Sequence, residues 1–218
     1  MSNNDYVTEI AVRQVKPGKL ESFKKRRASF VGALKKQKGI VADREFASFY
    51  ALPQPDETEV FIGMTTYESL DTQAKLQRNF GLLFKFLPFM MTMNMKAYVY
   101  VQPTEGPAFD LKKLAAKPGQ VLEVAVRRVE NGSGEAFHAK RKAFDDLLSR
   151  QDGALESYEF DVVKGNDADG LTVGMTVYES QEAFERISST LMQEPITQDY
   201  FATFTPVAVQ YAVSASND

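Results

Sequence analysis

GMTTYES, at residues 63–69, returns as GMTVYES at residues 174–180, so nearly the same seven residues occur twice, 111 positions apart. A second match lies upstream, where EIAVRQV (9–15) corresponds to EVAVRRV (123–129) with an offset of 114. The offset changes between ALPQPDETE (51–59) and KGNDADG (164–170), which are rich in turn-forming residues. Surface hairpins tolerate such a change in length. The pattern therefore indicates a tandem duplication, with half-units of about 6–102 and 120–213.

Each half predicts the order strand, helix, hairpin, helix, strand, which is the ferredoxin-like βαββαβ unit. The first helix of each half is expected to end near Gly39 or Gly153. The second helix follows Tyr-Glu-Ser, with Ser69 or Ser180 as its N-cap. The expected strands cover residues 6–15, 41–51, 58–67 and 96–102 in the first half, and 121–129, 155–163, 171–178 and 207–213 in the second.

The sheets of these two units need cover on both faces. The third strand of each half, VFIGM at 60–64 and LTVGM at 171–175, is apolar on both faces, whereas the helices of one unit cover only one face of its sheet. Two antiparallel sheets that pack face to face and close into a barrel would cover both faces and remove exposed edges. The sequence thus predicts an α+β fold with tandem repeats at 1–103 and 120–218, joined by a linker at 104–119.

The composition is that of an ordinary soluble protein, with 44% hydrophobic and 25% charged residues, a net charge of −3 and a pI of about 5.4. This balance favours neither nucleic acid nor a membrane as a partner. The longest apolar stretch, at 80–95, contains Lys85, Pro88 and Asn94 and is too short to span a bilayer. The absence of cysteine excludes disulfides and thiolate sites. The polar first residues lack a signal-peptide pattern, so a cytoplasmic location is expected.

Two βαββαβ units of this length, each with a helix directly after the third strand, resemble the dimeric α/β-barrel superfamily. Within it, the chain looks most similar to a tandem, fused pair of antibiotic-biosynthesis-monooxygenase-like domains. The resemblance implies an intramolecular dimeric-type α/β barrel, a pseudo-dimer within one chain. In that family the second helix often carries a His-x-x-x-Pro-His type of stretch. The segment LMQEPITQDYF (191–201) fits this stretch at Pro195, with Leu191 and Ile196 at the histidine positions.

Arg27 and Arg141 occupy equivalent positions on the apolar stripe of the first helix of each half, four residues after one phenylalanine and three before the next. A guanidinium in such a place must be paired or must face an anion. One interpretation is ligand binding, in which the two arginines anchor a carboxylate, enolate or phenolate. The alternative, which the pattern favours, is a structural ion pair or a side chain that extends to solvent.

The first strand of each half carries acids and bases on one face: Glu9, Ala11 and Arg13 in the first half, and Glu123, Ala125 and Arg127 in the second. These charged groups could meet inside the barrel around its pseudo-twofold axis. We expect a structural salt-bridge network, with Glu45 and Glu159 as further partners, rather than a catalytic acid–base pair.

Four tyrosines are further candidates for ligand binding: Tyr67 and Tyr178 in the repeated motif, and Tyr100 and Tyr211 on the last strands. A phenol can orient a ligand or donate a proton, although packing is the commoner role of a tyrosine on a strand. His138, the only histidine, is interpreted as a solvated or flanking residue. The Phe- and Met-rich stretch at 80–95 suits an apolar pocket, an interface or core packing. We predict neither a metal site nor a cofactor.

The sequence leaves the function open between classes. The resemblance implies a cofactor-independent monooxygenase-like enzyme that acts on a small aromatic or polyketide-like molecule, with the arginines stabilising an anion. The alternative is a non-catalytic small-molecule-binding or assembly module that has lost the family's catalytic residues. A haem-degrading monooxygenase is a weaker alternative. The sequence assigns no catalytic residue. The expected partner is a small apolar or aromatic anion, and self-association beyond the pseudo-dimer stays open.

Overall fold

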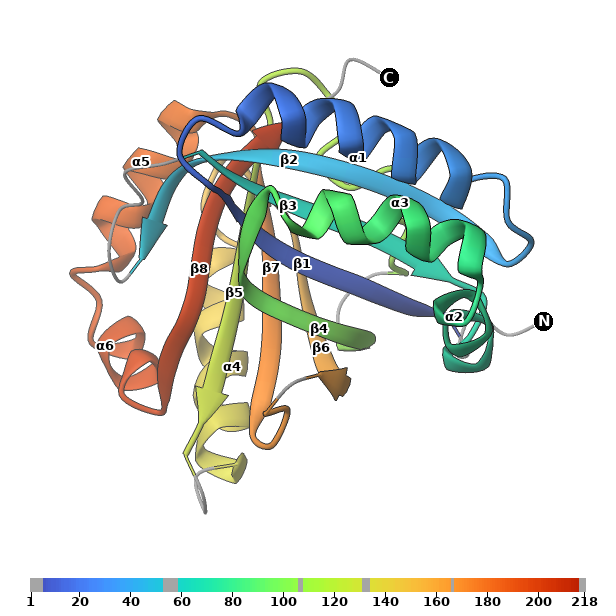
Figure 1. Cartoon of the computed structure of the whole chain (residues 1–218). Coiled ribbons are helices and arrows are strands. Elements are labelled where there is room, and N and C mark those ends of the chain that lie inside the picture. The colour runs from blue at the N-terminus through green and yellow to red at the C-terminus, as the bar shows by residue number, and fades with distance from the viewer. Residues whose placement is uncertain (1–5, 53–58, 106–107, 131–133, 166, 216–218) are drawn as a thin grey trace.

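The computed structural model describes residues 6–52, 59–105, 108–130, 134–165 and 167–215. Both halves have the same order of elements (Figure 1). The first half comprises β1 (Val7–Val15), α1 (Leu20–Leu34), β2 (Ile40–Leu52), β3 (Val60–Tyr67), α2 (Leu70–Gln77), α3 (Phe80–Met90) and β4 (Met93–Glu105). The second half comprises β5 (Val121–Val129), α4 (Gly134–Leu148), β6 (Ala154–Gly165), β7 (Leu171–Tyr178), α5 (Gln181–Leu191), α6 (Pro195–Phe201) and β8 (Phe204–Ser214).

The second helix of each half is in fact a pair of helices, α2 with α3 and α5 with α6. In the first half, the Asn79 side chain accepts a hydrogen bond from the backbone N–H of Leu82 at 3.3 Å and so starts α3 as a new helix. In the second half, α6 begins with Pro195, which is tolerated in the first turn of a helix but not in its interior. The last strands begin three residues earlier than predicted, at Met93 and Phe204.

The strands form one closed barrel in the order β1-β3-β2-β8-β5-β7-β6-β4. All neighbouring strands run antiparallel. The pairs β2–β8 and β4–β6 join the two halves, so each half closes the sheet edges of the other (Figure 1). This arrangement confirms the predicted α+β fold, in which two ferredoxin-like sheets form a single barrel within one chain.

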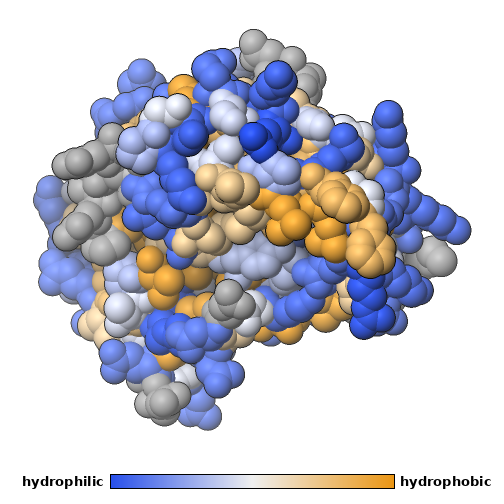
Figure 2. All heavy atoms as spheres, in the orientation of Figure 1, coloured by the Kyte–Doolittle hydropathy of each residue, from blue (hydrophilic) through white to orange (hydrophobic). Residues whose placement is uncertain are grey.

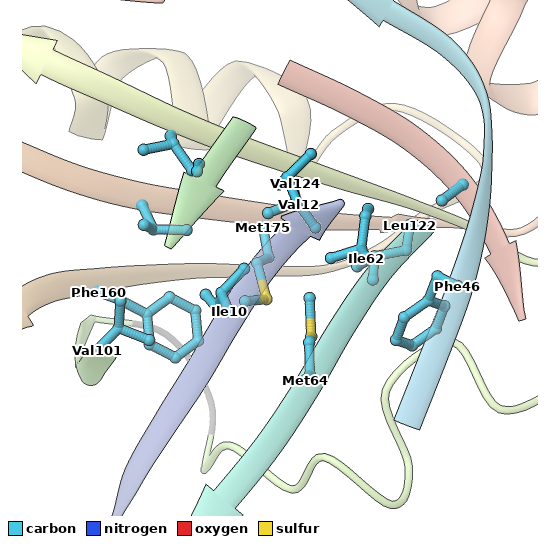
Figure 3. Close-up of a cluster of buried hydrophobic side chains, with 14 of the residues drawn as sticks. Ile10, Val12, Phe46, Ile62, Met64, Val101, Leu122, Val124, Phe160 and Met175 are labelled. Carbon is cyan, nitrogen blue, oxygen red and sulfur yellow. The ribbon is translucent and has the colours of Figure 1, made fainter. Parts of the chain in front are cut away.

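The barrel interior is a core of aliphatic, methionine and phenylalanine side chains from both halves. Ile10 and Val12 of β1 meet Val124 of β5 and Met175 of β7 there, all of them at most 1% exposed (Figure 3). These residues lie on the apolar face of each strand. Full burial of an aliphatic side chain of this size contributes about 1.5–3 kcal/mol, so this shared core ties the two halves together.

The charged face of the first strands lies outside the barrel, under the helices, and not inside it as the sequence suggested. Arg13 of β1 packs against the ring of Phe89 on α3, with 5.3 Å between Cζ and the ring centroid. Arg127 of β5 likewise lies near helix rings, 5.3 Å from that of Phe137 on α4 and 5.9 Å from that of Tyr200 on α6. Both faces of each strand are buried, and the face that points inward is mainly apolar, although Thr8 of β1 also lies on it and bonds to the Thr66 hydroxyl.

Helices α1 and α3 lie side by side over the sheet of the first half (Figure 1), where Phe23 packs on Phe89 with centroids 5.2 Å apart. Helices α4 and α6 do the same in the second half, where Phe144 stacks on Tyr200 at 4.9 Å. None of the helices in the described part of the chain combines the length and apolar character that crossing a bilayer requires.

The outer face of α3 is also apolar. Phe80, Phe84 and Leu87, followed by Met91 just beyond the helix, are between 59% and 77% exposed. Figure 2 shows this face as an orange band over α3. The opposite side of the helix buries Leu82 and Phe89. The Phe- and Met-rich stretch therefore contributes to the core and to the surface at once.

The repeated motif has a physical reason at each of its key positions. A Cβ on Gly174 would lie 2.8 Å from Arg127 Nη2, and a Cβ on Gly63 would lie closer still to the Arg13 guanidinium. The glycines are thus required because a guanidinium lies flat over the third strand of each half. The motif ends in the two predicted N-caps, whose hydroxyls accept from backbone N–H groups at 3.2 Å.

The segment between the halves packs against the barrel. Strand β4 continues to Glu105, past the start of the predicted linker. Leu111, Leu114 and Ala115 then join the barrel core, each at most 2% exposed. The Arg44 guanidinium of β2 donates a hydrogen bond to the carbonyl of Leu114. Three buried residues therefore anchor the described part of this connection to the barrel core.

Candidate functional site

Two cavities lie between the sheet and the helices, one in each half of the chain. The second-half cavity, as we call the larger, has a volume of about 440 Å3. Its polar lining includes Glu123, Arg127, Arg141, Tyr178, Tyr200 and Tyr211. Its apolar walls include Phe144, Phe184, Leu191, Phe201, Phe204 and Val209. The first-half cavity is the smaller, with a volume of about 250 Å3.

Strand β5 positions the charged groups of the second-half cavity. Alternate residues of a strand point to the same side, so Glu123, Ala125 and Arg127 all line the cavity. Cα atoms four residues apart on a strand are separated by about 13 Å. The carboxyl and guanidinium groups therefore approach the cavity from well-separated points. Gly174, the cross-strand neighbour of Ala125, carries no side chain, which leaves room for the Arg127 guanidinium.

Two phenols hold the Glu123 carboxylate. Tyr178 Oη donates to Glu123 Oε2 at 2.8 Å, and Tyr211 is a second hydrogen-bonding partner. Burial raises the pKa of Glu123, and the phenols together with Arg127 and Arg141 offset only part of this effect. A carboxylate with a raised pKa is a stronger base than an exposed one, as general-base catalysis near neutral pH requires. Burial beside Glu123 also raises the pKa of both tyrosines well above its ordinary value, so both remain protonated.

A single carboxylate bridges the two arginines of the cavity. Arg127 Nη2 donates to Glu159 Oε1 at 2.6 Å, and Arg141 Nε donates to Glu159 Oε2 at 2.8 Å. Burial alone would raise the pKa of Glu159, but the two arginines hold it below its ordinary value. Arg141 also pairs with Asp145 at 2.5 Å, and Arg127 donates to the hydroxyl of Tyr200. Burial raises the pKa of Tyr200 to about 12, so its hydroxyl keeps its proton at neutral pH.

Besides Arg141 Nη1, which pairs with Asp145, two polar atoms of cavity-lining residues have no hydrogen-bond partner among the described residues: Arg127 Nε and Thr197 Oγ1. The residues that carry them are 3% and 1% exposed, respectively. A buried polar group without a partner is costly, and such groups occur mainly where a ligand or a functional constraint accounts for them. The N–H of Arg127 is suited to donate to a ligand oxygen.

The cavities bring together five of the six residues that the sequence selected for ligand binding. Arg141, Tyr178 and Tyr211 line the second-half cavity, and Tyr67 and Tyr100 line the first-half cavity. That these five residues contact a ligand stays a prediction.

Arg27 lines neither cavity. Its Nε lies 2.5 Å from Glu45 Oε1, and its Nη2 lies 3.3 Å from Asp43 Oδ1. Arg13 shares the Glu45 carboxylate, at 3.3 Å. These contacts match the structural ion pair that was the alternative interpretation of Arg27.

Sequence reasoning did not select Tyr200, and it interpreted Glu123 and Arg127 as structural only. A signal for Tyr200 was nevertheless present. At the offset of 111, Tyr200 is the counterpart of Phe89, so a hydroxyl appears in one half where the other has a plain ring. Such differences between the two copies mark the places where the halves have diverged.

His138 is exposed on α4 and does not line the second-half cavity, although its ring lies 5.4 Å from that of Phe137. Among the described residues, no group of three or more histidine, cysteine, aspartate or glutamate side chains could hold a metal ion. The donor set does not fit haem either. The cavity offers neither an imidazole nor a thiolate, and the raised pKa values of its tyrosines oppose a phenolate ligand.

No protein-family model matches the sequence, and no curated protein matches it. Solved structures resemble the whole chain. An anthrone oxidase-like protein superposes with a TM-score of 0.71 at 11% identity, over 98% of this chain and 93% of the other. A protein described as a candidate monooxygenase from Fusobacterium nucleatum gives 0.63 at 12% identity, over 98% and 94%. A variant chlorite dismutase from Candidatus Nitrospira defluvii gives 0.62 at 10% identity, over 97% and 91%. At these identities the likeness establishes the fold.

Proposed function

We propose that this protein, which has the dimeric α/β-barrel fold, is a cofactor-independent oxygenase that acts on a small aromatic molecule in its second-half cavity. The observation that carries the proposal is that Glu123, Arg127 and Arg141 line one largely apolar cavity of about 440 Å3. Structures with the same fold, described as anthrone oxidase-like and as a candidate monooxygenase, support the choice of an oxygenase over other enzyme classes.

The volume and the aromatic lining of the cavity favour a flat, apolar substrate. Its volume falls within the range of about 300–1,000 Å3 that is usual for small-molecule sites. Phe144, Phe184, Phe201 and Phe204 supply aromatic walls, which pack well against a ring system. A substrate with two or three fused rings would reach from the carboxylate of Glu123 toward the guanidinium of Arg127.

Glu123 is the candidate general base. It would remove a proton from an activated C–H or O–H group of the substrate, and the negative charge would pass from the carboxylate to the substrate. Arg127, with an N–H group that has no partner among the described residues, would stabilise the new anion. Tyr178 and Tyr211 would keep the carboxyl group in place through both protonation states.

The carbanion or enolate formed in this way can reduce dioxygen without an external reductant. For a methylene group between aromatic rings, the substrate carbon forms a bond to oxygen, giving a peroxide that loses water. The overall change is CH2 + O2 to C=O + H2O, in which the methylene carbon is oxidised and dioxygen is reduced. The chain's own residues then act only on protons and charge.

Oxygen consumption with anthrone as the probe tests the proposal. Glu123→Gln keeps the size of the side chain but removes the base, and we expect the rate to fall by at least about 100-fold. Glu135→Gln, an exposed substitution on α4, is the matched control and should retain the wild-type rate. A Glu123→Gln variant with unchanged turnover would refute the role of the base. Binding of anthrone without oxygen consumption would support the non-catalytic binding module instead.

A further inference from the structure

The first-half cavity has no part in the function proposed above. It lies against α1, α2 and α3 and is lined by six polar side chains: Glu9, Tyr67, Gln73, Gln77, Tyr98 and Tyr100. Every other described lining residue is leucine or phenylalanine. Glu9 is therefore the only charged side chain among these lining residues, whereas two arginines line the second-half cavity.

A network of neutral donors surrounds the carboxylate of Glu9. Tyr67 Oη donates to Glu9 Oε2 at 2.9 Å, and Tyr98 and Tyr100 are further hydrogen-bonding partners of the same carboxylate. The hydroxyl oxygens of Tyr98 and Tyr100 lie 2.5 Å apart. Gln73 Nε2 donates to Tyr100 Oη at 2.7 Å, so the Tyr100 proton is free to point to Tyr98 or Glu9. These donors position the carboxylate without neutralising its charge.

Burial raises the pKa of Glu9 and Arg13 is the residue that most lowers it, but the Arg13 guanidinium pairs with a different carboxylate. Arg13 Nη1 donates to Glu45 Oε1 at 3.3 Å, and the ring of Phe89 covers its guanidinium at 5.3 Å. Gly63 leaves the space in which this guanidinium lies. Arg13 is consequently absent from the cavity lining, although its counterpart Arg127 lines the second-half cavity.

The aromatic rings around Glu9 suit a cation. Tyr67 and Tyr98 flank Tyr100, with ring centroids at 6.4 and 5.4 Å from it, and Phe30 and Phe86 line the same cavity. Ring faces attract cations through their quadrupole, and aromatic cages of this kind are common recognition sites for organic ammonium groups.

The Tyr100 ring already attracts one cation in this structure. Lys164 Nζ, from β6 of the other half, lies 5.0 Å from the Tyr100 ring centroid and donates to Gln73 Oε1 at 2.9 Å. Lys164 is exposed and is not among the lining residues of the cavity.

We infer that the first-half cavity binds a small organic cation, an ammonium group on a compact apolar body, with Glu9 as its counter-ion. The ammonium group lies against the carboxylate and the tyrosine rings, and the apolar body lies between Leu34, Leu76 and Phe86. A volume of about 250 Å3 limits the ligand to fewer atoms than a drug-sized molecule contains. This inference does not depend on the oxygenase proposal.

The proposal also predicts how binding changes with pH. Burial raises the pKa of Glu9, while Arg13 and the phenols of Tyr67, Tyr98 and Tyr100 lower it by a smaller amount. The lining residues from α1, α2 and α3 are uncharged. The association constant for an ammonium ligand should therefore increase as pH rises through the pKa of Glu9, because only the ionised carboxylate attracts the cation.

Isothermal titration calorimetry with three matched probes tests the inference: 2-phenylethylammonium, 2-phenylethanol and 3-phenylpropionate. We expect the ammonium compound to bind the wild-type protein more tightly than the alcohol, and the carboxylate to bind this site most weakly. Glu9→Gln should weaken ammonium binding about 10- to 100-fold and leave alcohol binding unchanged, because it removes the charge and keeps the shape. Glu21→Gln, an exposed change on α1, is the matched control.

Three results would overturn the inference. The first is an ammonium probe that binds no better than the alcohol, or does not bind at all. The second is unchanged ammonium binding in a folded Glu9→Gln protein, as judged by circular dichroism. The third is a loss of binding in Glu123→Gln instead of Glu9→Gln, which would place the cation in the other cavity.

Discussion

In the first half of the chain Phe89 lies over the guanidinium of Arg13, whereas at the equivalent position in the second half Tyr200 accepts a hydrogen bond from Arg127. Phe89 is 1% exposed and packs with Phe23, and neither Phe89 nor Arg13 is among the residues that line the first-half cavity. The hydroxyl of Tyr200 does the opposite, because it brings the arginine into a polar cluster that lines the cavity.

A second pair of equivalent residues differs in the same way. Phe61 of β3 packs on Phe23 with ring centroids 5.0 Å apart. Its counterpart Thr172 of β7 accepts from Arg127 at 3.0 Å and donates to Glu159 at 2.8 Å. Two replacements of phenylalanine by a hydroxyl-bearing residue thus accompany the change from a packed arginine to one that lines a cavity. The backbone frame of the two halves is the same, and the chemistry differs in a few side chains.

The largest effect on stability is expected from removing the Glu159 carboxylate, which pairs with both Arg127 and Arg141 in the second half. Glu159→Gln leaves Arg127 and Arg141 without their shared partner, and loss of one member of a buried ion pair costs about 3–5 kcal/mol. Glu45→Gln is the matched change in the first half. It should cost less, because the side chain of Arg27 is 16% exposed against 4% for Arg141, and because Glu45 lies 3.3 Å from Arg13 whereas Glu159 lies 2.6 Å from Arg127. Urea unfolding followed by circular dichroism measures both values. Equal costs would show that the two clusters are energetically alike.

A smaller effect is expected from making the second half resemble the first. Tyr200→Phe removes the hydroxyl that accepts from Arg127 and should lower the free energy of unfolding by about 1–3 kcal/mol. It should also weaken the binding of anionic aromatic ligands. Tyr158→Phe is the matched control, since Tyr158 bonds to the exposed Glu156, and about 0.5 kcal/mol or less is expected there. Similar losses in the two variants would contradict the special role of Tyr200.

The smallest expected effect is a change in the free energy of unfolding with pH, to which Glu9 in the first half and Glu123 in the second should contribute alike. Burial raises the pKa of Glu123 and of Glu9 above the ordinary value of 4.5 in the folded chain, so the folded state binds these protons more tightly than the unfolded state. Their contribution to stability is complete below pH 4.5 and is lost as the pH rises through the folded pKa, by up to about 1.4 kcal/mol per pH unit.

Glu123→Gln removes this dependence. The stability of the variant relative to the wild type should therefore increase with pH, and Glu9→Gln should behave in the same way. Thermal unfolding at a series of pH values between 4 and 8 measures the trend. A difference that stays constant with pH in both variants would show that neither carboxyl group is perturbed by its surroundings.

The repeated motif made the fold predictable because its glycine and its serine have local structural roles, and the duplication preserved these roles in both halves. Ser69 and Ser180 are N-caps, as the sequence indicated, and the barrel follows from two sheets that are apolar on both faces. The break between α2 and α3 was missed because an apolar run hid the cap at Asn79. The inward face of β1 was assigned wrongly, since periodicity separates two faces of a strand without saying which one turns to the barrel.

The site was less predictable than the fold. The sequence selected the tyrosines and Arg141 as candidates because repeated or unexpectedly placed polar residues are visible in a sequence, and the structure places them in the cavity linings. The sequence did not show that Arg127 lines its cavity whereas Arg13 does not. This difference depends on which side chain from a distant helix packs on each arginine. Phe89 and Tyr200 lie far along the chain from the arginines that they contact, so only tertiary packing reveals their roles.

A strand from the other half of the chain contacts or lines each cavity. Tyr50 and Leu52 of β2 line the second-half cavity, and Lys164 of β6 reaches Gln73 beside the first-half cavity. In a barrel assembled from two identical chains, every mutation would alter both pockets at once. Here a mutation alters one pocket and is inherited by that pocket alone. Fusion therefore gives natural selection two adjustable sites on one scaffold, and an experimenter can redesign one while the other reports whether the scaffold is intact.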